Sequence, residues 1–280
     1  MSAPVLAVPA HRGRLDETEQ HNRPDSVLLH SSRTVLRMLT TGSPQRATWR
    51  RSVRLFRLFL REQSDPATFY SAFADDSVDA LGAFVALAGK TVLDVGGGPG
   101  YFARSFRTAG ARYIGVELDV PSDAPAETFA LRGCGTSLPL RSGSVDIAYC
   151  SNLLEHVARP WDVADELVRV TRPGGTIFIS FTPWLSPWGG HETAPWHYLG
   201  GMRARQRYVR RNGHEPKNRF GESLFAHRAA DAVRWARARP GVAVVAMYPR
   251  YHPRGLRWIA SVPGLREVLT WNLALVLRRR

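Results

Sequence analysis

Short apolar runs rich in valine and isoleucine alternate with amphipathic segments through the middle and the end of the chain. Runs that are hydrophobic throughout, rather than at every second position, are typical of parallel strands covered on both faces. The amphipathic segments between them predict helices that connect one strand to the next. We therefore expect an α/β fold with a mostly parallel sheet and helices on both faces. The pattern predicts strands at 91–95, 112–117, 128–132, 145–150, 176–181, 242–247 and 273–277, with helices at 100–108 and 160–171.

The segments around this pattern differ in composition. Residues 1–45 mix proline, arginine, serine and acidic residues without periodicity and predict a disordered tail. Residues 46–89 predict helices that precede the sheet, and residues 90–181 form the strand-rich core. Residues 182–240 begin with three tryptophans among prolines and glycines and predict an ordered insert. Residues 241–280 supply the last two strands and a basic connector, so 46–280 is expected to be one domain.

A glycine-rich turn between a strand and a helix is the most informative motif of the chain. The segment Thr91–Phe102 reads as a buried strand, a turn with four glycines and the start of a helix, and Asp94 lies near the strand's end. The next predicted strand ends on a second carboxylate, Glu117. Ligands of open α/β sheets bind outside the carboxyl ends of the strands. Glycine lets a ligand approach bare backbone, and a carboxylate such as Glu117 can bind two ribose hydroxyls. These features predict a site for a nucleoside-containing ligand.

The details of the turn disfavour a dinucleotide. In the dinucleotide motif G-x-G-x-x-G the third glycine allows close helix packing under a pyrophosphate, and here Tyr101 takes that position after Gly96 and Gly98. Asp94 would repel a pyrophosphate but suits a cation. S-adenosylmethionine carries an ammonium, a sulfonium and a ribose and no phosphate, so it fits this pattern better. A nicotinamide-dependent oxidoreductase is the alternative that the tyrosine disfavours.

Four sequence blocks resemble one known family. They are the segment 93–100, Gly115-Val116-Glu117, the segment 138–147 and Arg172-Pro173-Gly174-Gly175-Thr176. At this spacing they resemble the class I S-adenosylmethionine-dependent methyltransferases, in the small-molecule branch with the ubiquinone/menaquinone and sterol enzymes. The whole chain also resembles uncharacterised actinobacterial methyltransferases, notably at Gly189-Gly190-His191-Glu192. The resemblance implies a Rossmann-like, seven-stranded sheet with an antiparallel last strand.

The same resemblance implies roles for individual residues. Asp94 and the glycine backbone would hold the methionine end of S-adenosylmethionine, Glu117 the ribose and Leu118 the adenine. Most relatives place an aspartate after the third strand; here Cys134 or a neighbour stands in its place. Ser151 and Asn152 follow the fourth strand, and Tyr70 is either a pocket aromatic or a core residue. The expected cofactor residues are Asp94, Gly96, Gly97, Gly98, Gly100, Tyr101, Glu117, Leu118, Cys134, Gly135, Ser151, Asn152 and Tyr70.

Candidate catalytic groups lie outside the glycine turn. His191 and Glu192 are adjacent in the tryptophan-rich insert, where a histidine beside a carboxylate can act as a base with a shifted pKa. In this family the insert borders the acceptor, so we interpret it as the wall or lid of the acceptor site. His156, just after the fourth strand, is either an acceptor base or pocket residue, or a histidine bonded to backbone.

The spacing of the histidines argues against a metal site. Histidines and glutamates are frequent in the insert, but no pair has the H-E-x-x-H spacing of helical zinc ligands, and cysteine pairs are absent from the sequence. We therefore predict no metal ligand. The residues considered were His191, His197, His214 and His227 with Glu192 and Glu215.

The composition of the chain bears on the protein's cellular location and on its binding partners. The two cysteines fit a reducing compartment, the N-terminal apolar run is too short for a secretory signal, and no run could span a membrane, so we expect a cytoplasmic protein. The net charge is +14, and residues 200–280 hold 18 basic against 4 acidic residues. Arginine-rich coding explains part of this surplus. A functional interpretation is an anionic partner, either an acidic acceptor or a lipid surface touched peripherally by the connector.

The sequence thus predicts a methyltransferase that uses S-adenosylmethionine and acts on a small-molecule or lipid-linked acceptor, by O- or C-methylation. The alternative is a non-catalytic module of the same fold whose basic last third binds nucleic acid or an anionic surface. An N-P-P-[YF] tetrapeptide, which marks methylation of nucleic-acid bases, is missing after the fourth strand, where Ser151–Leu154 stands. Nucleic acid is therefore the less favoured partner.

Overall fold

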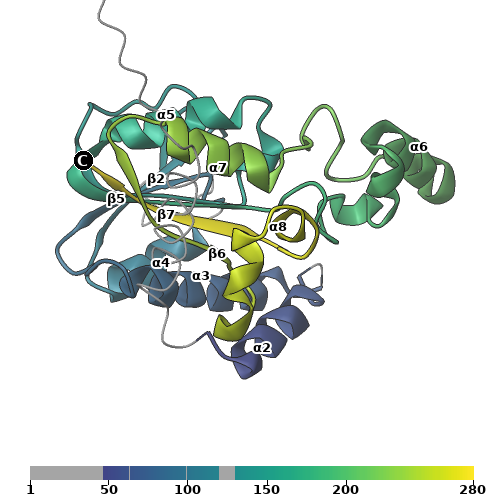
Figure 1. The fold of residues 1–280 in the computed structure, drawn as a ribbon, viewed down its shortest axis with the longest axis horizontal. Helices are drawn as coiled ribbons and strands as arrows, with labels where there is room; N and C mark the ends of the chain where they lie inside the picture. The colour runs from purple at the N-terminus through teal and green to yellow at the C-terminus, as the bar shows by residue number, and fades with distance from the viewer. Residues whose placement is uncertain (1–46, 63, 99, 120–129) are drawn as a thin grey trace, which may run out of the picture.

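The computed structural model describes residues 47–62, 64–98, 100–119 and 130–280. Figure 1 shows a central twisted sheet with helices above and below it and one helical extension at its side. The predicted tail, residues 1–45, lies outside the described residues. No helix in the described ranges is long and apolar enough to cross a membrane.

The sheet has seven strands in the order β3-β2-β1-β4-β5-β7-β6. Strands β1 to β5 are parallel where they pair, and β7 is antiparallel to both β5 and β6. Both the mostly parallel sheet and the antiparallel last strand are confirmed. The strands are β1 Thr91–Val95, β2 Arg112–Glu117, β3 Ala130–Arg132, β4 Val145–Ser151, β5 Thr171–Phe181, β6 Val242–Pro249 and β7 Leu273–Arg279.

Helices cover both faces of the sheet (Figure 1). Helices α5 (Pro160–Val170) and α7 (Ala229–Ala238) pack on one face, where their valines, leucine and alanines join one buried cluster. Helices α3 (Pro66–Gly82) and α4 (Tyr101–Thr108) pack on the other with their phenylalanines. Successive strand residues point to opposite faces, so the continuous apolar runs fill both clusters. Burying each large apolar side chain stabilises the fold by roughly 1.5–3 kcal/mol.

Local sequence signals set the ends of the pre-sheet helices. Helix α2 (Trp49–Phe59) begins after Thr48, whose side chain accepts a hydrogen bond from Arg51 N. Helix α3 begins with Pro66. The preceding residue, Asp65, caps the helix, because its side chain accepts a hydrogen bond from Thr68 N at 3.2 Å. Caps of this kind satisfy backbone donors that the first turn leaves free. Helices α2 and α3 follow one another along the chain, and both bring aromatic residues to the side of the sheet.

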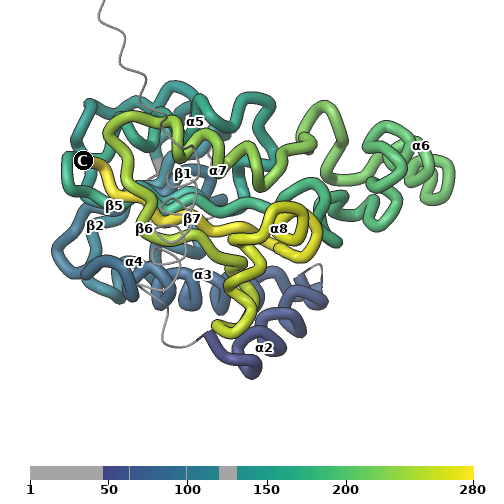
Figure 2. Tube along the Cα trace, viewed as in Figure 1, coloured from purple at the N-terminus to yellow at the C-terminus, as the bar shows by residue number. Residues whose placement is uncertain are grey.

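The insert leaves the sheet after β5 and extends away from it, as the green trace in Figure 2 shows. Its tryptophan-rich start forms only 3-10 turns, η3 (His191–Thr193) and η4 (Trp196–Leu199), and helix α6 (Gly201–Asn212) follows. The sequence predicts an insert that extends to residue 240. In the structure, however, helix α7 packs on β6 and covers the sheet, so it is not part of the extension. The extension itself therefore spans residues 182–228.

The insert's tryptophans are packed rather than free. Trp188 lies with its ring 5.2 Å from Phe59 of α2 and 6.2 Å from Trp271 before β7. Trp184 lies 4.8 Å from Phe220 within the insert. Aromatic pairs at such distances add roughly 0.5–1.5 kcal/mol each beyond the area they bury. The insert is thus held against α2 and the last strand.

Candidate active site

The carboxyl ends of the parallel strands bring most of the predicted residues to one edge of the sheet. Asp94 pairs with Gly115 of β2 and Tyr149 of β4, so β1, β2 and β4 end side by side. Glu117 is the last residue of β2, and Ser151 is the last of β4. This is the edge at which open α/β sheets bind ligands.

Both predicted carboxylates, Asp94 and Glu117, lie against the glycine turn. A Cβ atom at Gly97 would lie 2.3 Å from Oδ2 of Asp94, so no side chain fits between the turn and this carboxylate. Gly98 has φ +66°, a conformation that glycine adopts without strain, and its N–H donates to Oε1 of Glu117 at 2.6 Å. The turn is therefore folded tightly over β1 and β2.

Asp94 lies beneath this turn with 1% of its surface exposed. The pKa of its carboxyl is raised to about 7: burial is the main cause, the hydrogen bond donated by Tyr113 (2.8 Å) opposes the shift, and the Glu117 charge adds to it. Removing a carboxylate from water disfavours its charged form unless a positive group comes near. This position therefore favours a cationic ligand.

The residues predicted near ribose and adenine follow β2 and β3. Glu117 is partly buried, and burial raises the pKa of its carboxyl. Leu118 is 64% exposed, which leaves an apolar side chain available beside Glu117. Cys134 is exposed and its Sγ lies 3.1 Å from Oγ1 of Thr136, while Gly135 approaches Val163. No carboxylate stands at the position that relatives use for adenine.

Tyr70 and Tyr101 come together beside the turn. Their rings stack with centroids 5.5 Å apart, and the Tyr70 hydroxyl donates to Oε1 of Glu62 at 2.6 Å. Tyr101 begins α4, directly after the glycine turn. Tyr70 thus connects the pre-sheet helices to the turn, although its role in binding a cofactor stays a prediction.

Ser151 and Asn152 are tied down by residues from the end of the chain. The buried Arg250 donates to Oγ of Ser151 at 2.6 Å, and Asn272 donates to Oδ1 of Asn152 at 2.7 Å. Asn152 has φ +55°, an unusual backbone conformation for a residue other than glycine. Both side chains are thus already engaged in hydrogen bonds, and their expected part in cofactor binding stays a prediction.

His191 and Glu192 do not form the expected pair. Glu192 accepts a hydrogen bond from Nδ2 of Asn218 at 2.9 Å, and the ring of His191 lies 5.1 Å from that of His156. The pKa of His191 is lowered to about 3, mainly by burial and in smaller part by the neighbouring His156 and Lys217. A neutral ring with so low a pKa is a weak proton acceptor near neutral pH. The idea of a base activated by Glu192 is therefore not supported by this geometry.

The geometry of His156 agrees in part with the second alternative, a histidine that is hydrogen-bonded to backbone. It ends the short helix η2 (Leu154–His156), and its Nδ1 lies 2.7 Å from the carbonyl oxygen of Ser223 in the insert. Nε2 of His156 stays available. The ring thus joins the end of β4 to the insert.

Glu155 is the residue of this group that sequence reasoning missed. It is 1% exposed, and its Oε1 accepts from Thr182 N at 3.0 Å. One potential ligand atom from each of Glu155, His156 and His191 lies within 4.8 Å of the others. The signal available in the sequence was the Leu154-Glu155-His156 segment directly after the predicted fourth strand.

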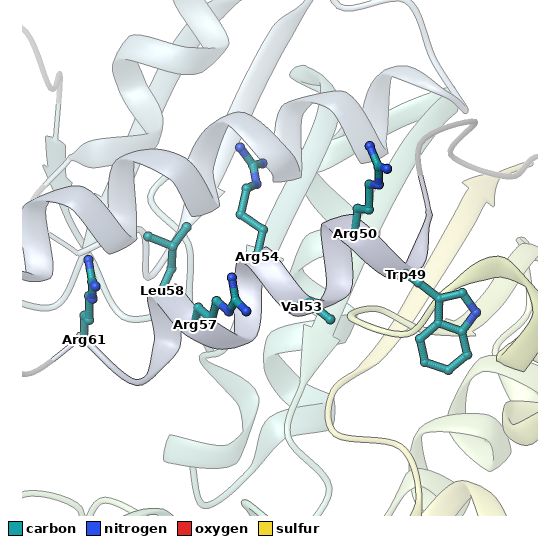
Figure 3. Close-up of a pocket in the computed structure, with 7 residues that line it drawn as sticks. All are labelled: Trp49, Arg50, Val53, Arg54, Arg57, Leu58 and Arg61. Atoms are coloured by element: carbon teal, nitrogen blue, oxygen red, sulfur yellow. The ribbon is translucent and has the colours of Figure 1, made fainter.

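A shallow groove follows α2 on a different part of the surface. Figure 3 shows Arg50 and Arg54 projecting from the same side of this helix, with Trp49 at its start. Arg57 and Arg61 continue the row. The groove contains no residue of the glycine turn, so its basic and aromatic lining is a feature separate from the strand ends.

Comparisons with known proteins identify a family for this chain. The family model "Methyltransferase domain" matches residues 93–179, from β1 through most of β5. An uncharacterised methyltransferase of Mycolicibacterium vanbaalenii is 51% identical over 247 residues, covering 83% of this chain and 96% of the relative. One from Mycobacteroides abscessus is 50% identical over 253 residues, covering 84% and 96%.

A solved structure adds a likeness in fold. The S-adenosylmethionine-dependent methyltransferase from Mesorhizobium loti is 19% identical, covers 72% of this chain and 96% of its own, and has a TM-score of 0.48. The two curated relatives, matched over nearly their whole length, decide the family. The chain belongs to the same methyltransferase family as these mycobacterial proteins.

Proposed function

We propose that this protein transfers a methyl group from S-adenosylmethionine to a small-molecule or lipid-linked acceptor. The observation that carries the proposal is the arrangement of Asp94, Gly97 and Glu117 at the carboxyl edge of the sheet. A tight turn without side chains lies there between one buried and one partly buried carboxylate. This edge suits a ligand that is cationic at one end and carries a ribose.

The residues present fit S-adenosylmethionine. The raised pKa of Asp94 reflects a carboxyl that lacks a positive neighbour, and an ammonium or sulfonium would supply one. Glu117 lies next to the turn and offers its second oxygen to ribose hydroxyls while Oε1 accepts from Gly98. A pyrophosphate would instead bring negative charge against both carboxylates. The fit therefore favours a sulfonium nucleoside over a dinucleotide.

The chain's part in the reaction is alignment. When bound, S-adenosylmethionine supplies an electrophilic methyl group. Glu117 and the glycine turn would fix the position of the nucleoside, and Trp188 packs the insert against α2. Holding two reactants in line lowers a barrier by about 7–11 kcal/mol in favourable cases.

For the acceptor, the proposal relies on aromatic and basic residues. Trp188, Phe56 and Trp271 form a contiguous aromatic cluster, with ring centroids 5.5 to 6.2 Å apart, between the insert, α2 and β7. Such a surface suits an apolar acceptor, and the surplus of arginine in the last third suits an anionic one. An amphipathic, lipid-linked metabolite combines both properties.

Calorimetric titration with S-adenosylhomocysteine, the demethylated form of the cofactor, tests this proposal. We expect one-to-one binding by the wild type. In Glu117→Ala the loss of a charged hydrogen-bond acceptor should weaken binding by roughly 10- to 100-fold, because such bonds contribute about 1.5–3 kcal/mol. The control Asp119→Ala, at an exposed carboxylate nearby, should bind like the wild type.

The opposite result has a clear form. If the wild type binds reduced nicotinamide dinucleotide and not S-adenosylhomocysteine, the edge is a dinucleotide site and the proposal fails. Equal affinity of Glu117→Ala and wild type would remove Glu117 from the ribose position.

A further inference from the structure

Three residues from η2 and the insert form a cluster that the proposed methyl transfer does not yet use. Glu155 and His156 lie in η2, directly after β4, and His191 lies in η3 of the insert. One potential ligand atom from each residue lies within 4.8 Å of the other two. Imidazole nitrogen and carboxylate oxygen are both common metal ligands.

Two atoms of the cluster are buried without a hydrogen-bond partner. Oε2 of Glu155 and Nε2 of His191 are both inaccessible to solvent and neither has a partner among the described residues. Nearly all buried polar atoms in native proteins are paired, and a buried, unpaired one costs about 1–3 kcal/mol. Two such atoms on neighbouring side chains indicate that a partner binds between them.

The third ligand is oriented as metal-bound histidines are. Nδ1 of His156 lies 2.7 Å from the Ser223 carbonyl, so its N–H donates there and Nε2 keeps its lone pair. A metal-ligating histidine typically donates its other ring N–H to a carbonyl or carboxylate, which fixes the tautomer. Oε1 of Glu155 is likewise fixed by Thr182 N, which leaves Oε2 as the free oxygen.

We propose that Glu155, His156 and His191 bind one divalent transition-metal ion, of the Zn²⁺ or Mn²⁺ class. Two nitrogens and one carboxylate oxygen suit such ions and leave coordination positions open. The φ of +47° at His191 is the backbone conformation that presents this ring to η2.

The metal defines the acceptor class, a step that rests on the proposed methyl transfer. An alcohol or phenol binds the ion through its oxygen, and the ion lowers the pKa of that hydroxyl. The hydroxyl proton passes to a solvent water molecule. An oxygen lone pair then forms the bond to the methyl carbon, the carbon–sulfur bond breaks, and its electron pair stays on sulfur. The products are a methyl ether, a neutral thioether and one proton, so the site favours O-methylation.

The site also connects the insert to the core. His191 comes from the insert, while Glu155 O accepts from Phe225 N and Nδ1 of His156 donates to the carbonyl oxygen of Ser223. A bound ion would therefore hold the acceptor-side insert against the end of β4. Metal binding is thus expected to raise thermal stability as well as to position the acceptor.

Direct metal titration tests the site without any acceptor. The full chain, stripped of metal by dialysis against a chelator, is titrated calorimetrically with ZnCl₂ and, separately, MnCl₂. We expect one ion per chain in the wild type. Glu155→Gln and His191→Asn should each bind the ion about 100-fold more weakly. His214→Asn is the matched control, since this exposed histidine of the insert lies outside the cluster and should bind like the wild type.

The same samples separate this proposal from the methyl-transfer proposal. Both ligand variants should bind S-adenosylhomocysteine within about threefold of the wild type, which also shows that they fold. The visible spectrum of the Co²⁺-loaded wild type provides a second measurement, and intense four- or five-coordinate bands are expected instead of the weak spectrum of the aqueous ion. Absence of one-to-one metal binding by the wild type, or unchanged binding in both variants, would overturn the metal site, whatever the result with S-adenosylhomocysteine.

Discussion

The buried carboxylate of Asp94 lowers the stability of the ligand-free protein and is expected to strengthen the binding of a cationic ligand. Its carboxyl is fully buried, its nearest donor is the Tyr113 hydroxyl, and its pKa lies near 7. Without a ligand, this carboxyl therefore stays protonated up to about pH 7, and a bound cation would favour its charged form. Strained or underpaired groups of this kind are common at functional sites.

The pKa of Asp94 predicts a specific pH dependence of stability. Because the folded pKa of about 7 exceeds the ordinary 3.8, the folded protein binds more protons here between these values, and its free energy of unfolding falls as pH rises through this window. Asp94→Asn should remove several kcal/mol of that fall. Urea unfolding at pH 5 and pH 8 measures it, with Asp119→Asn as the exposed control. Parallel pH slopes for wild type and Asp94→Asn would contradict the assignment.

The same residue makes cofactor affinity depend on pH. At pH 6 binding of a cationic nucleoside must first release the Asp94 proton, whereas at pH 8 the carboxylate is already charged. The affinity of the wild type for S-adenosylmethionine should therefore rise by up to about tenfold between these pH values. Asp94→Asn should show a flat and weaker affinity in the same titrations. A wild-type affinity that falls as pH rises would exclude this coupling.

At the scale of secondary-structure elements, Arg250 connects the sheet to the pre-sheet helices. Its guanidinium is 1% exposed, and NH1 donates to Ser151 and Ser180 while NH2 donates to Ser77 and Tyr149. These partners belong to β4, β5 and α3. The ring of Phe73 lies 4.6 Å from the guanidinium carbon. One side chain thus fixes the ends of several elements beneath the candidate site.

Replacing Arg250 should therefore be costly. Arg250→Met leaves buried hydroxyls without their donor, and the free energy of unfolding should fall by about 3–5 kcal/mol. Chemical denaturation checks the value. Arg254→Met, at an exposed arginine of the same connector, should change it by less than about 0.5 kcal/mol. A loss at Arg250 as small as that at Arg254 would show that the network does not stabilise the fold.

The elements were far easier to predict than the contacts between their ends. Continuous apolar runs and the Gly96–Gly98 turn fix the strands and the loop, because burial and glycine geometry act locally. The contact of Glu155 with His191 and the bond from Arg250 to Ser151 join residues distant in sequence. Nothing in local periodicity encodes such contacts, since the loops that make them have none. Spacing rules for metal ligands cannot detect a cluster of this kind for the same reason.

At the scale of the whole molecule, α2 presents a basic and aromatic surface. Trp49 is 65% exposed, and Arg50, Arg54 and Arg57 line the same groove (Figure 3). Arg254 N donates to Ala47 O at 2.8 Å, so the basic connector, with its half-exposed Trp258, begins beside α2. We propose that this surface contacts an anionic lipid membrane, which would present a lipid-linked acceptor to the enzyme.

Vesicle sedimentation tests the lipid contact. The protein should pellet with vesicles containing anionic lipid and stay in solution with zwitterionic ones, because each surface arginine contributes about 1 kcal/mol near an anionic bilayer. Trp49→Glu and Arg54→Glu should each reduce the bound fraction, and Arg104→Glu on α4 serves as the exposed control. Equal pelleting by all variants, or none by the wild type, would rule this surface out.

A crystal structure of the chain grown with S-adenosylhomocysteine tests the central claim most directly. We expect density for the nucleoside along the turn at Gly96–Gly98, with its ribose hydroxyls bonded to Glu117 and its amino group on the side of Asp94. Density for that ligand elsewhere, or an edge that takes up only a pyrophosphate compound when both are offered, would contradict the assignment of this protein's methyl donor.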